Sequence, residues 1–432
     1  MAKYEQYDGY KDSGVKWLDV IPSHWVMSKI KYISPFQVGW TPPTGNESNF
    51  IGENIWANIS DLRGKIITDT VKRISDKAAK EASMDITPKG SLLYSFKLSV
   101  GSVSFAGCDM YTNEAIASFT LDSLLPLEYL YYVLPKFLIE NASTNIYGAR
   151  ILNQELIRNA IILKPTYKEA ETIANFLDFE TAQIDTLIEK QQTLIQLLKE
   201  KRQAVISHAV TKGLNPDAPM KDSGVEWLGD VPEHWEVSKL KFVSDIIDCR
   251  NKTPEYFENG EYFVVRTTNV RHQKLNFNGA LYTDKKNFDI WTQRGVPAAG
   301  SILFTREAPT GEVCLVPENL KFCMGQRMMN FIAHNESYTN YLFDYLISDC
   351  LDRYINSVSH LRVEQVQNIP VLVPPLEEII QIHKHIEQLK LSFDNIELNA
   401  KKAIHLMQER RTALISAAVT GKIDVRGWRA PE

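Results

Sequence analysis

Residues whose types and spacing could support catalysis or metal binding form few recognisable patterns in this sequence. Neither a G-x-G-x-x-G dinucleotide loop nor a G-x-x-x-x-G-K-(S/T) phosphate loop occurs. Asn215-Pro216-Asp217-Ala218 lacks the aromatic residue with which an amino-methyltransferase loop would stack an extruded base. No Glu-x-Lys follows Pro216-Asp217 to complete a nuclease metal site. His383 and His385 are two apart on an expected helix, so they face different sides. We therefore predict no catalytic residue and no metal ligand.

Other side chains have the types that recognise the edges of DNA bases. Arg or Lys bonds to guanine, Asn or Gln to adenine, and Ser or Thr is an adaptable donor. Between Arg250 and Arg306 the chain carries nine basic residues and five acidic ones, although its formal net charge is −5. They are Arg250, Lys252, Arg266, Arg271, Lys274, Lys285, Lys286, Arg294 and Arg306, against Glu255, Glu258, Glu261, Asp284 and Asp289. This balance indicates a local basic face.

Candidates for DNA contact occur in both halves of the chain, some at expected strand ends and hairpins and the others further along the same half. In the first half they are Asn58, Ser60, Asp61, Lys97, Ser99, Tyr147, Arg150 and Asn153. In the second half they are Arg266, Thr267, Asn269, Arg271, His272, Arg306, Arg327 and Arg362. An ordinary charged surface would carry the same residue types, so a purely structural interpretation of each stays open.

Composition limits the class of protein. A chain of 432 residues is long enough for two or three domains. It has no apolar run of about 18 residues and a polar start, Met1–Gln6, so we expect neither a membrane span nor a signal peptide. Five cysteines without a C-x-x-C pair predict reduced thiols and a cytoplasmic protein, and argue against a disulfide frame or a zinc site.

An internal repeat supplies the elements that must position these candidates. Residues 11–33 contain Lys-Asp-Ser-Gly-Val-Lys-Trp-Leu and then Ile-Pro-Ser-His-Trp, and residues 221–243 repeat this pattern at an offset of 210. We call these two stretches the frame segments. Their His24-Trp25 and His234-Trp235 pairs are predicted to be structural, with the tryptophans as core anchors.

Weaker matches continue the repeat. Gly90–Tyr94 and Gly300–Phe304 each predict a β-hairpin with variable residues at its turn. Strands are expected at Ile55–Asp61, Phe263–Asn269, Ala160–Leu163 and Ile369–Val373, and helical segments at Leu127–Ile139 and Tyr338–Tyr354.

A long helical pattern ends each half. Thr166 with Glu169 fits a capping box, and Pro375 suits a first helical turn. One heptad register holds Leu177, Ile184, Leu198 and Val205 in the first helix and Ile386, Phe393, Ala400, Met407 and Leu414 in the second. A second register holds Ile173, Leu187 and Leu194, or Ile382, Leu389, Ile396 and Ala403. The two registers predict a coiled-coil seam, and about 44 residues of helix would span on the order of 65 Å.

The repeat is cyclic. Residues 221–243 follow the first long helix, but their counterpart, 11–33, stands at the start of the chain. We expect residues 11–33 to lie beside the end of the second helix as 221–243 lie beside the end of the first. This arrangement predicts neighbouring termini, antiparallel helices and pseudo-two-fold symmetry.

The order of these motifs resembles the specificity (DNA-recognition) subunit of type I restriction-modification systems. The frame segments, the Thr41-Pro42 and Thr253-Pro254 entries, the twin hairpins and the twin helix ends carry the resemblance over nearly the whole chain. Pro165-Thr166-Tyr167-Lys168 departs from the usual Pro-Pro-x-x-Glu start, which is present at Pro374–Glu378. The resemblance implies an α+β fold: two pseudo-symmetric globular α/β recognition domains separated by two long antiparallel coiled-coil helices.

The resemblance also implies boundaries and partners. The expected parts are a first recognition domain (1–164), a central helix spacer (165–214), a second recognition domain (215–373) and a distal helix with a tail (374–432). Each domain would read half of a split double-stranded DNA target, and the helices would set the gap and bind two modification subunits. A restriction (nuclease-translocase) subunit would join them. S-adenosylmethionine, ATP and Mg would belong to those partners, with no cofactor on this chain and no membrane.

Two alternatives remain at this stage. A coiled-coil scaffold whose two globular ends bind proteins would show the same helices. An enzyme in its own right would have to cut or methylate DNA alone. The first domain has few basic residues, which suggests that the modification subunits supply part of the contacts to the DNA phosphates.

Overall fold

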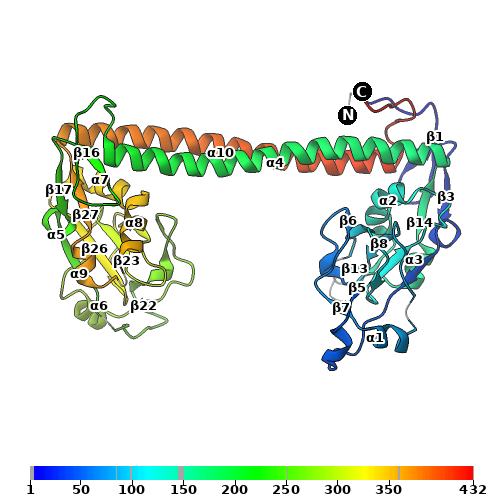
Figure 1. Cartoon of the computed structure of the whole chain (residues 1–432), viewed down its shortest axis with the longest axis horizontal. Helices are drawn as coiled ribbons and strands as arrows, with labels where there is room; N and C mark the ends of the chain where they lie inside the picture. Colours follow the sequence, from blue (N-terminus) through cyan, green and yellow to red (C-terminus); the bar gives the residue numbers. More distant parts are fainter. Residues whose placement is uncertain are drawn as a thin grey trace. The chain divides into compact units, whose positions relative to one another are not determined.

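The computed structural model describes residues 4–83, 85–97, 100–144, 150–250, 252–358 and 361–431. The chain divides into two compact units, and each combines sequence from distant parts of the chain. Unit 1 contains Met1–Lys190 and Ala403–Glu432, and unit 2 contains Gln191–Lys402. Each unit holds one globular domain and one part of both long helices (Figure 1).

The frame segments form the same strands in both units. In unit 1, β1 (Tyr10–Asp12) pairs with β2 (Val20–Pro22), and β3 (Val26–Lys29) pairs with β14 (Ile161–Lys164). In unit 2, the corresponding antiparallel pairs are β15 (Met220–Asp222) with β16 (Asp230–Pro232), and β17 (Glu236–Lys239) with β27 (Pro370–Val373). The repeat at offset 210 is therefore also a repeat of structure.

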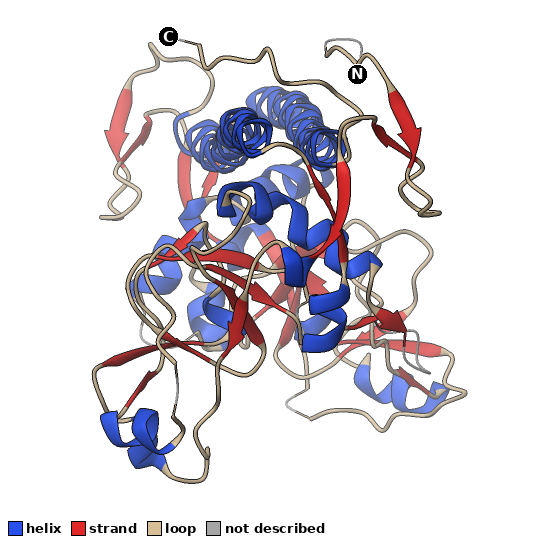
Figure 2. Cartoon of the chain, turned by 90° about the vertical axis from the view of Figure 1, so that its right-hand side faces the viewer, coloured by secondary structure: helices blue, strands red, loops and turns tan. Residues whose placement is uncertain are grey.

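Each globular domain is built around two sheets of three or more strands, and Figure 2 shows the strands in red. The larger sheet of unit 1 has the order β4 (Phe36–Val38), β11 (Ile116–Phe119), β8 (Leu92–Ser95), β9 (Val103–Ala106), β6 (Ile66–Ile67). That of unit 2 has the order β18 (Ser244–Asp248), β26 (Met328–Ala333), β23 (Ile302–Thr305), β24 (Val313–Leu315). The second sheets are β10 (Tyr111–Thr112), β5 (Asn54–Ala57), β7 (Arg73–Ile74) in unit 1, and β22 (Tyr282–Thr283), β19 (Tyr262–Val265), β25 (Phe322–Met324) in unit 2. Both predicted hairpins are confirmed as β8–β9 and β23–β24.

Shorter elements complete the two domains. A further pair in unit 1 joins β12 (Ser143–Thr144) to β13 (Arg150–Ile151), and the unit 1 helices are α1 (Asp76–Glu81), α2 (Leu127–Glu140) and α3 (Gln154–Asn159). Unit 2 contains α5 (Leu240–Val243), α6 (Lys285–Trp291), α7 (Glu336–Leu346), α8 (Asp349–Ser357) and α9 (Val363–Gln367). The segment expected to be helical at Tyr338–Tyr354 is thus two helices. Ser348 separates them, because its side chain accepts a hydrogen bond from the Cys350 N–H and caps α8.

The two strands expected at Ile55–Asp61 and Phe263–Asn269 are shorter than predicted. β5 and β19 end early, and each is followed by a 3₁₀ turn, η3 (Ile59–Asp61) or η4 (Thr267–Asn269). The alternating pattern continues through these turns, so it did not reveal where the strand stops.

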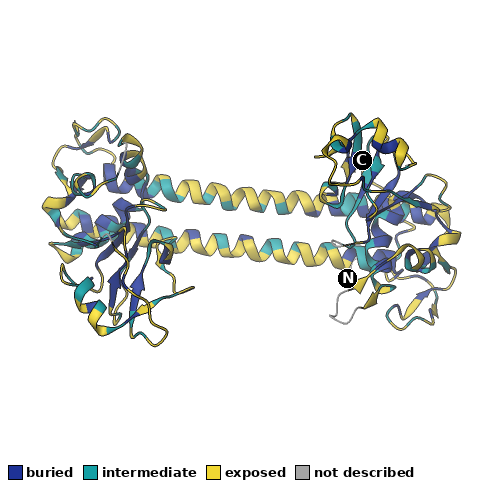
Figure 3. Ribbon diagram, turned by 90° about the horizontal axis from the view of Figure 1, so that it is seen from below, coloured by how far each residue is buried: buried dark blue, intermediate teal, exposed yellow. Residues whose placement is uncertain are grey.

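The long helices are α4 (Tyr167–Lys212) and α10 (Leu376–Val419). The Glu169 N–H donates to Thr166 Oγ1 at 3.2 Å, which is one half of the predicted capping box. The Glu169 side chain instead accepts hydrogen bonds from Tyr7, His24 and Trp25. Within each unit the segments of α4 and α10 run antiparallel (Figure 1). Both helices are exposed along much of their surface (Figure 3).

Only one of the two predicted heptad registers forms the buried seam throughout. Leu177, Ile184, Ile386, Phe393, Ala400 and Leu414 are buried, and Leu198, Val205 and Met407 are half-buried. In the second register, Ile173 and Ile382 are buried. Leu187 and Leu194 are 49% and 37% exposed, and Ile396 is also exposed, so the prediction is wrong at these three positions. In α4, Thr181, Ile188 and Ile195 are less exposed than Leu187 and Leu194. They follow the first register by four residues and the predicted leucines follow it by three, and both spacings place a residue beside the same heptad row.

The cyclic arrangement is confirmed in each unit. Gly421 follows α10 with φ +72°, and a Cβ there would lie 2.4 Å from Pro22 Cδ. Gly213 follows α4 with φ +77°, and its Cβ would lie 3.2 Å from the Trp235 ring. Glycine in this left-handed conformation ends both helices and allows the frame segment to pack closely. The Asp424 N–H donates to Glu5 O at 2.8 Å, so the two ends of the chain are neighbours in unit 1.

Candidate nucleic-acid interface

A buried carboxylate joins the unit 1 frame segment to the start of α4. Glu169 accepts hydrogen bonds from Tyr7 Oη at 2.9 Å, Trp25 Nε1 at 2.9 Å and His24 Nε2 at 3.0 Å. Trp25 is fully buried, as predicted for a core anchor. The Trp25 indole and the Tyr7 hydroxyl both donate to Glu169. Glu169 therefore satisfies buried polar groups that would otherwise destabilise the fold.

The same joint recurs in unit 2. Glu378 accepts from Trp235 Nε1 at 2.9 Å and from His234 Nε2 at 2.6 Å. We predicted from the sequence that the His-Trp pairs are structural, but not that Glu169 and Glu378 bind them. Glu169 and Glu378 are 209 residues apart, and each lies in the first turn of a long helix. This repeat of position could have revealed that they have the same role.

The twin hairpins share one backbone design. In unit 1, the Ser102 N–H donates to Ser95 Oγ and the Gly101 N–H to Ser95 O. In unit 2, the Glu312 N–H donates to Thr305 Oγ1 and the Gly311 N–H to Thr305 O. A buried hydroxyl therefore closes the base of each hairpin, and the sequence between its ends differs between the two domains.

In unit 1, three candidates close one local turn. Asn58 caps η3, accepting from the Ser60 N–H at 2.7 Å and from Ser60 Oγ at 2.6 Å. Asp61 Oδ2 accepts from the Asn58 N–H at 2.9 Å. The structure thus brings Asn58, Ser60 and Asp61 together, with their polar atoms engaged with one another.

The other unit 1 candidates lie apart from this turn. Lys97 is exposed at the β8–β9 turn, and Ser99 in the same turn lies outside the described residues, as does Tyr147. Arg150 donates to Ile139 O at 2.7 Å, at the end of α2. Asn153 caps α3 by accepting from the Leu156 N–H at 2.8 Å.

In unit 2, the strand-end cluster mixes buried and exposed groups. Asn269 is fully buried and bonds to the Arg266 N–H and to Asn276 O. Arg266 donates to Gly279 O at 2.9 Å, and Thr267 Oγ1 donates to Ala308 O at 3.1 Å. Arg271 donates to the carbonyls of Thr267 and Val270. His272 is exposed at the following turn.

Among the remaining unit 2 candidates, Arg306 lies beside Asp248, where Arg294 joins it. Arg306 is buried beyond the hairpin strand and lies 3.4 Å from Asp248 Oδ1, and Arg294 lies 3.4 Å from Asp248 Oδ2. Burial raises the pKa of the Asp248 carboxyl, and the two guanidinium groups oppose that rise. Arg327 is exposed and pairs with Glu307 at 3.0 Å, whereas Arg362 is exposed at the start of α9.

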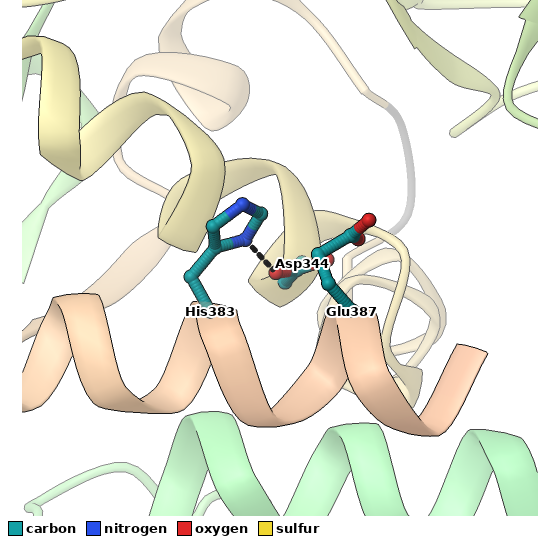
Figure 4. Close-up of side chains that lie close together, drawn as sticks. All are labelled: Asp344, His383 and Glu387. Carbon is teal, nitrogen blue, oxygen red and sulfur yellow. Dashed lines mark hydrogen bonds and ion pairs between the residues drawn. The ribbon is translucent and has the colours of Figure 1, made fainter. Parts of the chain in front are cut away.

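A separate cluster of ionisable groups joins α7 to α10 (Figure 4). Asp344 is fully buried and accepts from His383 Nδ1 at 3.1 Å, with Glu387 beside them. Lys390 Nζ lies 2.7 Å from Asp344 and 3.0 Å from Glu387. The lysine ammonium therefore already supplies a cation to both carboxylates. His385 is exposed, so the two histidines face different sides as predicted.

Comparison with known proteins places this geometry in a family. Residues 22–199 and 232–406 match the model of the type I restriction modification DNA specificity domain, so the chain belongs to that family. It is a specificity subunit of a type I restriction-modification system, with two DNA target-recognition domains.

The similar proteins agree with this assignment. The MjaIX specificity subunit of Methanocaldococcus jannaschii is 24% identical, with 98% of this chain and 99% of the relative covered. The EcoKI specificity subunit of Escherichia coli K12 is 25% identical, with 67% and 62% covered. The HsdS subunit from Thermoanaerobacter tengcongensis has a similar fold, with a TM-score of 0.57, 13% identity, and 95% and 100% of the chains covered. A chain solved in work on assembly of the type I R-M system has a TM-score of 0.69 at 13% identity, with 92% and 98% covered.

Across the described residues, no helix is both long and apolar enough to cross a membrane.

Proposed function

We propose that each globular domain reads one half of a bipartite DNA target and that the chain performs no chemistry itself. The observation that carries this proposal is the twin hairpin, in which the same hydrogen bonds at the base close turns of different sequence in the two units. Two domains with the same hairpin but different turn residues are suited to recognise two different half-site sequences. Burial raises the pKa of Cys314 and Cys323 to about 12, so neither thiol is a nucleophile near neutral pH.

Exposure and engagement divide the contact candidates. Lys97, His272, Arg327 and Arg362 are exposed, and we propose them as groups that reach DNA. Asn58, Asp61, Asn153 and Asn269 bond to backbone groups in their own turns, so we propose that they shape the reading surface.

The long helices are proposed to set the gap between half-sites. The test is footprinting of the complex with its modification subunits, followed by the same measurement after one heptad is added to both α4 and α10. Two protected tracts should move apart while both half-site sequences stay unchanged. Unchanged spacing with altered half-sites, or no sequence preference in the unmodified complex, would overturn the proposal.

We further propose that two modification subunits dock on equivalent apolar patches, one on each unit. Tyr32 and Phe242 occupy the same repeat position and are 64% and 65% exposed. Tyr167 and Leu376 begin the two long helices and are 59% and 49% exposed. Exposed apolar side chains mark a partner site where they gather, and the repetition of these positions on both units fits one partner bound twice.

The unit 2 patch has a defined shape. Phe242 and Leu376 line one groove of about 330 Å³ together with Val243 and Ile379. The chain entering this region is held alike in both units, because the Leu124 N–H donates to Ile33 O and the His334 N–H to Val243 O. S-adenosylmethionine, ATP and Mg are proposed to bind the partner subunits, together with the restriction subunit that completes the complex.

Native mass spectrometry tests this docking. The Phe242→Ser/Leu376→Ser variant should bind one modification subunit about 10-fold more weakly, because a few buried anchor residues carry most of the binding free energy. Its affinity for the other modification subunit should be unchanged. Tyr32→Ser/Tyr167→Ser should weaken the other step. Val71→Ser, which changes an isolated exposed residue of unit 1, is the control. Two tightly bound partners in both patch variants would contradict the proposal.

A further inference from the structure

Unit 2 contains a hairpin whose turn has an unusual backbone. β20 (Val270–Arg271) and β21 (Lys274–Leu275) pair antiparallel and are joined by His272 and Gln273 alone. The φ angles of these two residues are +52° and +64°. A two-residue turn of this form favours Asn-Gly or Gly-Gly, because a Cβ makes positive φ unfavourable.

Several contacts hold the turn in this conformation. Val270 is fully buried in a core cluster that includes Val265, and Leu275 packs against it. The His272 N–H donates to Glu312 Oε2 at 3.1 Å, which ties the turn to the β23–β24 hairpin. Arg271 bonds to carbonyls on its own side of the turn. The surrounding structure therefore imposes a conformation that the residues themselves disfavour, as often occurs at functional sites.

The two turn side chains are exposed. Among the described residues, no side chain or carbonyl forms a hydrogen bond with the His272 imidazole or the Gln273 carboxamide. By contrast, Asn269 is buried and Arg271 is engaged. The tip thus presents two polar side chains in a fixed place, next to the exposed Lys274.

Unit 1 has no such hairpin among its described residues. After η3 the chain passes through Leu62–Lys65 and enters β6, which pairs in parallel with β9. The tip is therefore a feature of the second domain and would affect only that domain's half-site.

We propose that the His272–Gln273 tip reads bases in the half-site of the second domain, with the Gln273 carboxamide paired to an adenine. A two-stranded ribbon fits the major groove, and a carboxamide can donate to adenine N7 and accept from its N6 amino group. Lys274 beside it would contact a phosphate, which positions the ribbon without selecting sequence. This inference rests on the proposed reading of one half-site by each domain.

The test is selection of bound duplexes from a pool in which both half-sites are randomised, using the complex with its modification subunits. Gln273→Gly should lower discrimination at one base pair of the second half-site by about 10- to 100-fold, and leave the first half-site unchanged. Glycine removes the side chain and also accepts the positive φ, so the variant should melt at the same or a higher temperature.

Asn319→Gly is the matched control, because Asn319 is another exposed residue of unit 2 with a positive φ, +61°. It should melt like Gln273→Gly and keep every base preference. If Gln273→Gly and His272→Gly both keep the original preferences, the tip does not read bases and the inference fails. If the unmodified complex shows no preference in either half-site, the proposed function itself fails.

Discussion

The position just beyond the first hairpin strand differs in chemistry between the two recognition domains. In unit 1 it is Phe96, whose N–H donates to Ala115 O, and in unit 2 it is Arg306, whose N–H donates to Arg327 O. Phe96 lies in the apolar core, whereas Arg306 lies beside Asp248, and Val38 has the equivalent strand position in unit 1. The same backbone thus accommodates either apolar packing or an ion pair at this position. The hairpin backbone is the same in both units at this position, while the side chains that pack beside it differ.

A second contact between domain and long helix, formed by an aspartate and a lysine, also differs between the units. In unit 1, Tyr132 of α2 and Lys65 both bond to Asp178 of α4 at 2.5 Å. In unit 2, the acid, Asp344, is on α7, and the lysine, Lys390, is on α10. The carboxylate is on the long helix in unit 1 and on the domain in unit 2, so the two contacts are not interchangeable.

The largest expected effect distinguishes the two frame glutamates. Glu169→Ala should lower the free energy of unfolding by about 4 kcal/mol, because three donors lose a buried charged acceptor. Glu378→Ala should cost about half as much, since Glu378 has two such donors and a partly exposed side chain. Urea denaturation followed by tryptophan fluorescence measures both, with Glu171→Ala on the exposed face of α4 as control. An equal loss in both variants would show that the joints are energetically equivalent.

Transplanting the ion pair tests whether the two hairpins are interchangeable. Phe96→Arg should destabilise the protein by about 3 kcal/mol, because it places an unpaired charge in an apolar core. Val38→Asp added to Phe96→Arg should restore at least about 1 kcal/mol, as expected for coupled neighbours. Thermal unfolding of the two single variants and the double variant forms the cycle. Additive losses would mean that unit 1 cannot hold the pair found in unit 2.

The smallest effect concerns pH. The hydrogen bond to Asp344 raises the pKa of His383, and Glu387 favours the same charged form while Lys390 opposes it. The protonated imidazole therefore stabilises unit 2 fully below the ordinary pKa of about 6.5, and this stabilisation is lost as pH rises through the raised value. His383→Gln should cost about 1 kcal/mol at pH 5.5 and much less at pH 8.5. The exposed His385→Gln is the control, and a loss independent of pH would exclude the ionic contribution.

Much of the fold could be predicted because it depends on local or repeated patterns. The Thr166 cap, the apolar row through Leu177 and Ile386, and the two hairpins follow from residue type and spacing. The candidate site was harder to predict, because a polar side chain at a strand end can cap its own turn or face solvent. Asn269 does the first and His272 the second, although they are three residues apart.

The sequence by itself determined the twofold repeat, its cyclic order and the neighbouring ends of the chain, because duplicated motifs can be aligned without coordinates. Only the tertiary structure decided which flank of the heptad row is buried, which left Leu187 exposed. It also decided that Glu169 and Glu378 join helix to frame, and that His272 and Gln273 form a strained tip. These outcomes depend on contacts between residues far apart in sequence, where several arrangements share the same local pattern and packing selects one.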